Sequence, residues 1–406
     1  MEDLFKVALG IEYPWFISNL SFDSDSKRLD VQLSYKRGSH FEVDNTACPV
    51  HDTVEKSWRH LNFFEHECHL HARIPRVKTP DGRTIMVTPP WSGKLSGFTL
   101  LFEALILQLC KHMPVHQLAK MTGISDYRIW NMLDVYVAAA RFDEDWSSVS
   151  AIGMDETSVA KGHDYITLFV DMNQRRTLHV AEGKGHETVA EFVTQLNEHQ
   201  GNSKQIEQVS CDMSPAFIKG VREFLPNAAI TFDKFHVAKI INEGVDWVRR
   251  EEAKTNPLLK NSRFVFLKND ANLTVKQRKK KEELQISELN LNSMEALRMR
   301  ENFQQIYHAK TALSFVKLLN DWVKWVEKCG LKPMEKVANT IARHIDGILQ
   351  WKTSQLNNGI LEGLNSVIQA AKRKARGYKK KHFATIAHLI TGKLNLSAIN
   401  SKYKPT

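Results

Sequence analysis

Three acidic residues stand where metal-dependent phosphoryl chemistry would need carboxylates. Asp155 ends the run 151–155, whose side chains alternate between two faces, and Asp212 follows a predicted strand at 206–211. Glu362 lies in a helix-like stretch far downstream. Carboxylate oxygens are the ligands that Mg²⁺ prefers, so these acids are candidate ligands of a divalent ion.

The elements around the first two acids predict how they meet. Residues 150–182 predict three strands in a row, followed by an amphipathic helix over 186–199 and a fourth strand over 206–211. This order resembles the start of a ribonuclease-H-like sheet. In that fold the first and fourth strands lie side by side, which would bring Asp155 and Asp212 together.

Glu362 belongs to a predicted helix over residues 357–378 that ends in a basic stretch. One of its faces carries Glu362, Asn365, Gln369 and Arg373. A carboxylate for an ion and cations for neighbouring phosphates suit a DNA substrate, and seven of the ten residues 372–381 are basic. The DNA-contact candidates here are Asn365, Lys372, Arg373 and Arg376. The alternative is an exposed glutamate paired with an arginine or lysine.

Other polar residues compete for the same site. Asp164, Asp171 and Glu156 fit turns or the opposite strand face. Asp233 ends a further strand and could bind a metal or support a ligand, and His236 could orient a carboxylate or touch phosphate. The alternative for His236 is a packed histidine in the first turn of a helix.

Residues 95–145 predict a helix-turn-helix domain. The segment 115–133 has the pattern of helix, tight turn and helix, with Gly123 in the turn and Ser125 at the start of the second helix. The outward residues of that helix, where a recognition helix would meet DNA, include Tyr127, Arg128 and Asn131. An ordinary helical hairpin is the alternative.

The segment before it contains cysteines and histidines at the spacing of a zinc knuckle. Residues 1–45 precede a predicted zinc-finger-like module at 46–90, in which two Cys-x2-His pairs would bind a structural Zn²⁺. The ligands would be Cys48, His51, Cys68 and His71, with His66 or His69 as substitutes for the last. The alternative is two buried cysteines among chance histidines.

Composition sets broad limits on the protein class. The 406 residues carry ten more Lys and Arg than Asp and Glu, which favours a polyanionic partner. The longest apolar run, 98–110, is too short to span a bilayer, and the N-terminus lacks the pattern of a signal peptide. The number of cysteines, five, is small and odd, which argues against a disulfide framework. We therefore expect a cytoplasmic protein that does not bind membranes.

The order of motifs along the chain resembles the DDE transposases of bacterial insertion sequences, and among them the ISL-three family. The motifs are the Cys-x2-His pairs, the helix-turn-helix, GMDET, CDMSPAF, DKFHV and NNGILEGLNSVIQAAKRKARGY. The resemblance implies an α/β, ribonuclease-H-like catalytic core, formed by residues 148–245 and 351–406 and interrupted by a helical insertion at 246–350.

The resemblance also implies the chemistry. Asp155, Asp212 and Glu362 would be the catalytic acids and would bind two Mg²⁺ or Mn²⁺ ions, with Asp155 bridging them. The protein would bind the two ends of an element as a homodimer, cleave the DNA and transfer the strand. Two alternatives share these features: a DNA-binding regulator derived from a transposase, and a nuclease without strand transfer.

Overall fold

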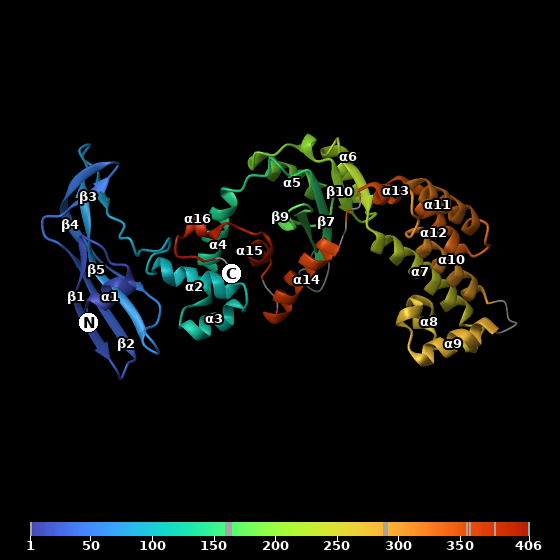
Figure 1. Cartoon of the computed structure of the whole chain (residues 1–406), viewed down its shortest axis with the longest axis horizontal. Coiled ribbons are helices and arrows are strands. Elements are labelled where there is room, and N and C mark those ends of the chain that lie inside the picture. The colour runs from blue at the N-terminus through green and yellow to red at the C-terminus, as the bar shows by residue number, and fades with distance from the viewer. Residues whose placement is uncertain are drawn as a thin grey trace. The chain divides into compact units, whose positions relative to one another are not determined.

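The computed structural model describes residues 2–158, 165–286, 291–354, 356, 359–376 and 379–404. These residues form two compact units. The first unit comprises Met1–Glu144 with Gln369–Thr406, and the second comprises Asp145–Ile368. Figure 1 shows the elements of both units, coloured from blue at the N-terminus to red at the C-terminus. The boundary near the C-terminus differs from the predicted one, which placed all of 351–406 with the catalytic core.

A mixed sheet forms the N-terminal part of the first unit. Its strand order is β1-β2-β5-β4-β3, with β6 paired to β5, and a helix, α1, precedes it. The elements are α1 (Glu2–Leu9), β1 (Trp15–Asp23), β2 (Arg28–Tyr35), β3 (His40–Val43), β4 (Thr46–Arg59), β5 (Glu67–Lys78) and β6 (Thr84–Met86). Leu29, Val31 and Leu33 alternate along β2 and are buried in the core of this sheet.

The two cysteines of the predicted zinc module lie far apart along a hairpin. Cys48 is near the start of β4, where Val50 pairs with Val77, whereas Cys68 is at the other end of the ladder near the start of β5. At about 3.3 Å per residue, nine residues of strand separate Cys68 from Val77 by about 30 Å. Both cysteines are buried in the apolar core, with relative exposures of 2% and 3%.

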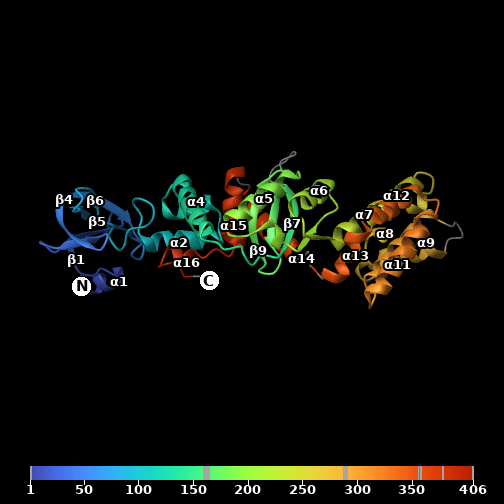
Figure 2. The same cartoon turned by 90° about the horizontal axis from the view of Figure 1, so that it is seen from above.

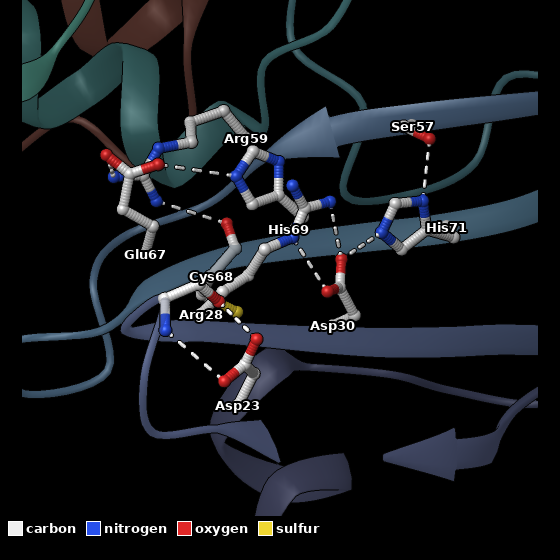
Figure 3. Close-up of polar contacts among 10 residues, drawn as sticks. Asp23, Arg28, Asp30, Ser57, Arg59, Glu67, Cys68, His69 and His71 are labelled. Atoms are coloured by element: carbon white, nitrogen blue, oxygen red, sulfur yellow. Dashed lines mark hydrogen bonds and ion pairs between the residues drawn. The ribbon is translucent and has the colours of Figure 1, made fainter. Parts of the chain in front are cut away.

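The predicted histidine ligands have other environments. His71 lies between two side chains, with Nδ1 2.7 Å from Ser57 Oγ and Nε2 2.6 Å from Asp30 Oδ1 (Figure 3). His51 is exposed on β4. Throughout the described part of the chain, no three His, Cys, Asp or Glu side chains are close enough to hold a metal. The structure therefore does not support a zinc module at 46–90. Burial against the rest of the sheet stabilises this segment instead.

The helix-turn-helix follows the sheet. α2 (Leu100–Cys110), α3 (Val115–Thr122) and α4 (Asp126–Phe142) are joined by short turns. Gly123 has the positive φ, 72°, that the tight turn requires, and its N–H bonds to the end of α3. Ser125 stands at the N-cap position of α4, as predicted.

C-terminal residues complete this helical core. α15 (Lys380–Thr391) and α16 (Leu396–Ile399) pack on α4, and both figures of the whole chain show α15 beside it (Figures 1 and 2). The apolar residues shared by the two segments include Leu118, Ile129, Leu133, Ile386, Leu389, Leu396 and Tyr403.

The second unit is built on a sheet with the order β11-β10-β7-β8-β9. Its strands are β7 (Ala151–Ser158), β8 (Tyr165–Asp171), β9 (Arg176–Glu182), β10 (Gln208–Cys211) and β11 (Ala229–Phe232). β7, β8 and β9 form the predicted antiparallel meander, and β10 pairs with β7 in parallel. The predicted pairing of the first and fourth strands is thus confirmed.

Helices cover both faces of this sheet. Ile152 and Met154 face α5 (Glu187–Glu198) and α6 (Pro215–Phe224) in the main core. The alternate residues of β7 face the other side, where Leu361 packs. This residue belongs to α14 (Gly359–Lys374), which Figure 1 shows on the side of the sheet away from α5 and α6.

A helical segment separates β11 from α14. It begins with α7 (Lys234–Glu252) and continues through α8 (Arg263–Leu267), α9 (Val275–Ile286), α10 (Asn292–Ile306), α11 (Ala312–Val326), α12 (Lys332–Arg343) and α13 (Ile345–Ser354). Trp322 is buried and its Nε1–H donates to Met299 O at 2.8 Å. Among the helices described, none has the length and hydropathy to cross a membrane.

Candidate active site

Three strands bring aspartates to one edge of the sheet. Ser210 of β10 pairs with Gly153 of β7, so continuing the register by two residues aligns Asp212 with Asp155. β11 pairs with β10 in parallel and ends directly before Asp233, the N-cap residue of α7. Because the carboxyl ends of parallel strands meet at one edge, Asp155, Asp212 and Asp233 lie in sequence across it.

Asp155 is partly buried, and desolvation affects its carboxyl group. Burial raises the pKa of its carboxyl group, the nearby His236 lowers it, and the negative charge of Asp212 raises it again. Asn365 Nδ2 donates to Asp155 Oδ2 at 3.4 Å. Two carboxylates this close, with one of them desolvated, form a site that favours a cation.

Asp212 and Asp233 differ in what already binds them. Asp212 Oδ1 accepts the backbone N–H of Ser214 at 2.9 Å. Asp233 is buried, caps α7 by accepting the N–H of Phe235 at 3.0 Å, and has Oδ2 3.0 Å from His236 Nδ1. Asp233 is therefore placed to support its neighbours, whereas the charge of Asp212 acts on Asp155 from the adjacent strand.

His236 is a cation candidate within this group of acids. A hydrogen bond to Asp233 raises the pKa of the imidazole, and the charges of Asp233, Asp212 and Asp155 raise it further although burial lowers it. The ring comes from the first turn of α7, where the sequence predicted it. A positively charged ring there could contact phosphate or orient Asp233.

α14 reaches the site through a close contact with β7. A Cβ on Gly153 would lie only 2.6 Å from Leu361 Cδ1, so the absence of a side chain allows the helix to approach. One turn further along, Asn365 reaches Asp155. Asn365 was predicted to contact DNA. Its place on the same helix face as Glu362 was the feature of the sequence that indicated a position near the acids.

Glu362 is exposed on the same helix, next to the buried Leu361. No set of three carboxylate, thiol or imidazole groups lies within metal-binding distance among the described residues, so Glu362 does not join Asp155 and Asp212 in this structure. The site assembled here consists of those two aspartates with Asn365, His236 and Asp233.

The competing acids occupy structural roles where they are described. Asp171 is buried and accepts the N–H groups of Asn173 and Gln174 in the turn after β8. Glu156 lies 4.0 Å from Lys184. Asp164 lies outside the described residues.

The predicted DNA contacts on α4 belong to the first unit. Tyr127 and Asn131 are exposed on α4. Arg128 is bound within its own unit, because its guanidinium lies 4.0 Å from the centre of the Phe98 ring and Nη2 donates to Ser96 O at 3.2 Å.

The basic end of α14 is also in the first unit. Lys372, Arg373 and Arg376 follow Ile368, where the second unit ends. Arg373 and Arg376 are exposed, and Lys374 Nζ donates to His112 O at 2.6 Å. These cations therefore group with the helix-turn-helix.

Comparison with known proteins decides the family. A family model described as a transposase, of the DDE type of ISL3, matches residues 152–387. A second model, the helix-turn-helix domain of transposase family ISL3, matches residues 87–137. The chain belongs to the ISL3 family of DDE transposases. The domain that carries the aspartates is therefore that of an enzyme family.

Two curated relatives agree with this assignment. The chain is 27% identical over 343 residues to the transposase for insertion sequence element IS1001 of Bordetella parapertussis, covering 82% of this chain and 84% of that protein. It is 26% identical over 363 residues to the transposase for insertion sequence element IS1557 of Mycobacterium tuberculosis, covering 80% and 78%.

DDE transposases use divalent metal ions, and the residues present fit that requirement. Hard oxygen donors suit Mg²⁺ or Mn²⁺. A cation bound by Asp155 and Asp212 would favour the ionised form of both carboxylates and so oppose the effect of burial on Asp155.

Proposed function

We propose that this ISL3 transposase binds the ends of an insertion sequence, cleaves the DNA in a metal-dependent reaction and transfers the freed strand to target DNA. The observation that carries this proposal is the β7–β10 register, which sets Asp212 beside Asp155. Asn365, from the helix that also bears Glu362, bonds to Asp155.

Each residue has a distinct role in the proposed reaction. Asp155 and Asp212 would hold a divalent ion between them, and Glu362 on α14 would supply the third carboxylate, with a second ion as its partner. The metal, when bound, supplies positive charge to the attacking and leaving oxygens of the phosphodiester. Asn365 fixes the orientation of Asp155, and Asp233 holds the His236 ring near the acids.

The proposed DNA partner engages the first unit. Tyr127 and Asn131 on α4 would face base edges in the major groove, as the second helix of a helix-turn-helix does. The exposed cations at the end of α14, including Arg373 and Arg376, would bind backbone phosphates together with Lys372. A homodimer is proposed because two element ends must be brought together.

The test is a nicking assay on labelled duplex DNA that carries the element end. Purified protein is incubated with Mg²⁺, with Mn²⁺ or with EDTA, beside Glu362→Gln, Asp155→Asn and Asp212→Asn. We expect metal-dependent nicking by the natural protein and a loss of about 10³-fold or more in each variant, with end binding retained. The matched control is Asp145→Asn, an exposed carboxylate of the same unit that bonds to Ser147.

Two outcomes would replace the proposal. End binding without nicking in either metal would identify a DNA-binding regulator, and nicking without joining to a target duplex would identify a nuclease. Glu362→Gln nicking at the natural rate would remove Glu362 from the site.

A further inference from the structure

The C-terminal segment of the chain forms one wall of the helix-turn-helix. The ring of His382 in α15 stacks on Trp130 of α4, with 3.9 Å between centroids. Thr385 Oγ1 donates to Asp134 Oδ1 at 2.7 Å. Sequence positions separated by about two hundred and fifty residues thus stand side by side (Figures 1 and 2).

Buried polar contacts hold this segment in place. Asn400 Nδ2 donates to Leu100 O at 2.9 Å and to Tyr136 Oη at 3.1 Å. Tyr136 Oη in turn donates to Glu103 Oε2 at 2.5 Å. Because these groups are buried and hydrogen-bonded to one another, they fix the C-terminal segment against α2 and α4.

A cavity of about 390 Å³ opens between α4 and the start of α15. Its walls bring Tyr127 and Asn131, the predicted base-facing residues, together with Lys379 and Lys381. Tyr127 is 79% exposed and both lysines are exposed. The cavity therefore joins an aromatic and amide surface to a pair of cations.

The charges around the cavity leave the lysines available. Asp134 accepts a hydrogen bond from the Thr385 hydroxyl group, and Asp126 Oδ2 lies 3.4 Å from His116 Nδ1. Neither Lys379 nor Lys381 makes an ion pair with any residue that the structure describes. Two cations at a fixed distance from a recognition helix suit the backbone of the DNA on which that helix lies.

We propose that Lys379 and Lys381 bind backbone phosphates next to the base pairs that face Tyr127 and Asn131. The C-terminal segment is then a second, sequence-distant part of the DNA-binding surface. This inference rests on the proposed function, since it assumes that α4 docks on DNA. In the structure these lysines lie at the helix-turn-helix, whereas the sequence predicted that the basic run belongs to the catalytic core.

The experiment compares Lys379→Gln/Lys381→Gln with the natural protein, both as full chains, by fluorescence anisotropy with element-end and scrambled duplexes at several salt concentrations. Loss of two phosphate contacts lowers the slope of log Kd against log salt by about 1.8. We expect this change on both duplexes, with binding weakened about tenfold at low salt, because phosphate contacts carry no sequence information.

The matched control is Lys402→Gln/Lys404→Gln, which removes the same charge from the same segment at exposed positions that do not line the cavity. It should keep the natural slope. An equal fall in slope in this control would overturn the inference, and so would an unchanged slope in Lys379→Gln/Lys381→Gln.

A further variant separates charge from folding. Lys379→Arg/Lys381→Arg keeps both cations and should keep the salt slope, so its loss would also overturn the inference. If the natural protein neither prefers element ends nor nicks them with Mg²⁺, the proposed function fails. If it does both and the glutamine variant binds like it, only the role of the two lysines fails.

Discussion

Asn365 links α14, the helix that carries Glu362, to the edge of the sheet that carries Asp155. Its amide donates to Asp155, a carboxyl group that burial and the Asp212 charge make harder to ionise. A hydrogen bond to the ionised form opposes that effect and lowers the pKa of Asp155. We therefore propose that Asn365 is a positioning residue that acts through Asp155.

Replacing Asn365 by Leu should raise the Mg²⁺ concentration needed for half-maximal nicking by about tenfold, the usual scale for groups that support metal ligands. The nicking rate at saturating Mg²⁺ should change much less. The measurement is a Mg²⁺ titration of nicking, and the control is Ser366→Ala, an exposed position on the same helix. A loss of rate with no change in the Mg²⁺ midpoint would contradict the assignment.

At the scale of elements, the junction between β4 and α2 carries a titratable contact. His60 Nδ1 lies 2.9 Å from Thr99 Oγ1, and Thr99 caps α2 by accepting the N–H of Phe102 at 3.3 Å. Burial, with a smaller effect of the Arg59 charge, lowers the pKa of His60 to about 4. The native state thus favours the neutral ring, whose Nδ1 can accept a hydrogen bond from the Thr99 hydroxyl group.

This lowered pKa predicts the sign of a pH dependence. Below the ordinary pKa of about 6.5, the unfolded chain binds a proton that the folded chain does not, so stability is lost as the pH falls from about 6.5 to about 4. The full loss is about 3 kcal/mol. Urea unfolding across this range should show a shallower dependence for His60→Gln.

The control for that experiment is His40→Asn, since His40 is exposed on β3. It should reproduce the natural pH dependence. Parallel curves for the natural protein and His60→Gln would mean that the His60 ring does not stay neutral in the folded state.

At the scale of the whole molecule, the DNA-binding unit is discontinuous in sequence. Residues 1–144 and 369–406 share one apolar core, and the buried amide of Asn400 bonds to Tyr136. The unit boundary falls inside α14, so the helix that carries Glu362 continues into the DNA-binding unit.

A fragment of residues 1–144 should therefore be unstable alone, because Tyr136 and the apolar face of α4 lose their cover. Joining 369–406 to it through a flexible linker should restore cooperative urea unfolding. The matched control is the same fusion with Asn400→Ala, expected to be about 1–3 kcal/mol less stable because buried polar groups lose their partner. Equal urea midpoints for 1–144 and the fusion would show that the C-terminal segment is not part of the unit.

Local pattern in the sequence determined much of this protein. Alternation around Asp155 predicted β7, the residue patterns before Asp212 and Asp233 predicted strands, and Gly123 marked the turn of the helix-turn-helix. These features depend on the near neighbours of each residue, because side-chain period and turn conformation are local properties. The family resemblance rested on the same motifs and is confirmed.

Only the tertiary structure decided which distant segments meet. The two Cys-x2-His pairs have the spacing of a metal site, but spacing alone does not show whether the cysteines meet. The long strands β4 and β5 keep Cys48 and Cys68 apart. Nor could the sequence show that Lys379 lies by Tyr127, since that depends on α15 packing against α4. Such pairings depend on the burial of apolar faces contributed by segments far apart along the chain, which no local window contains.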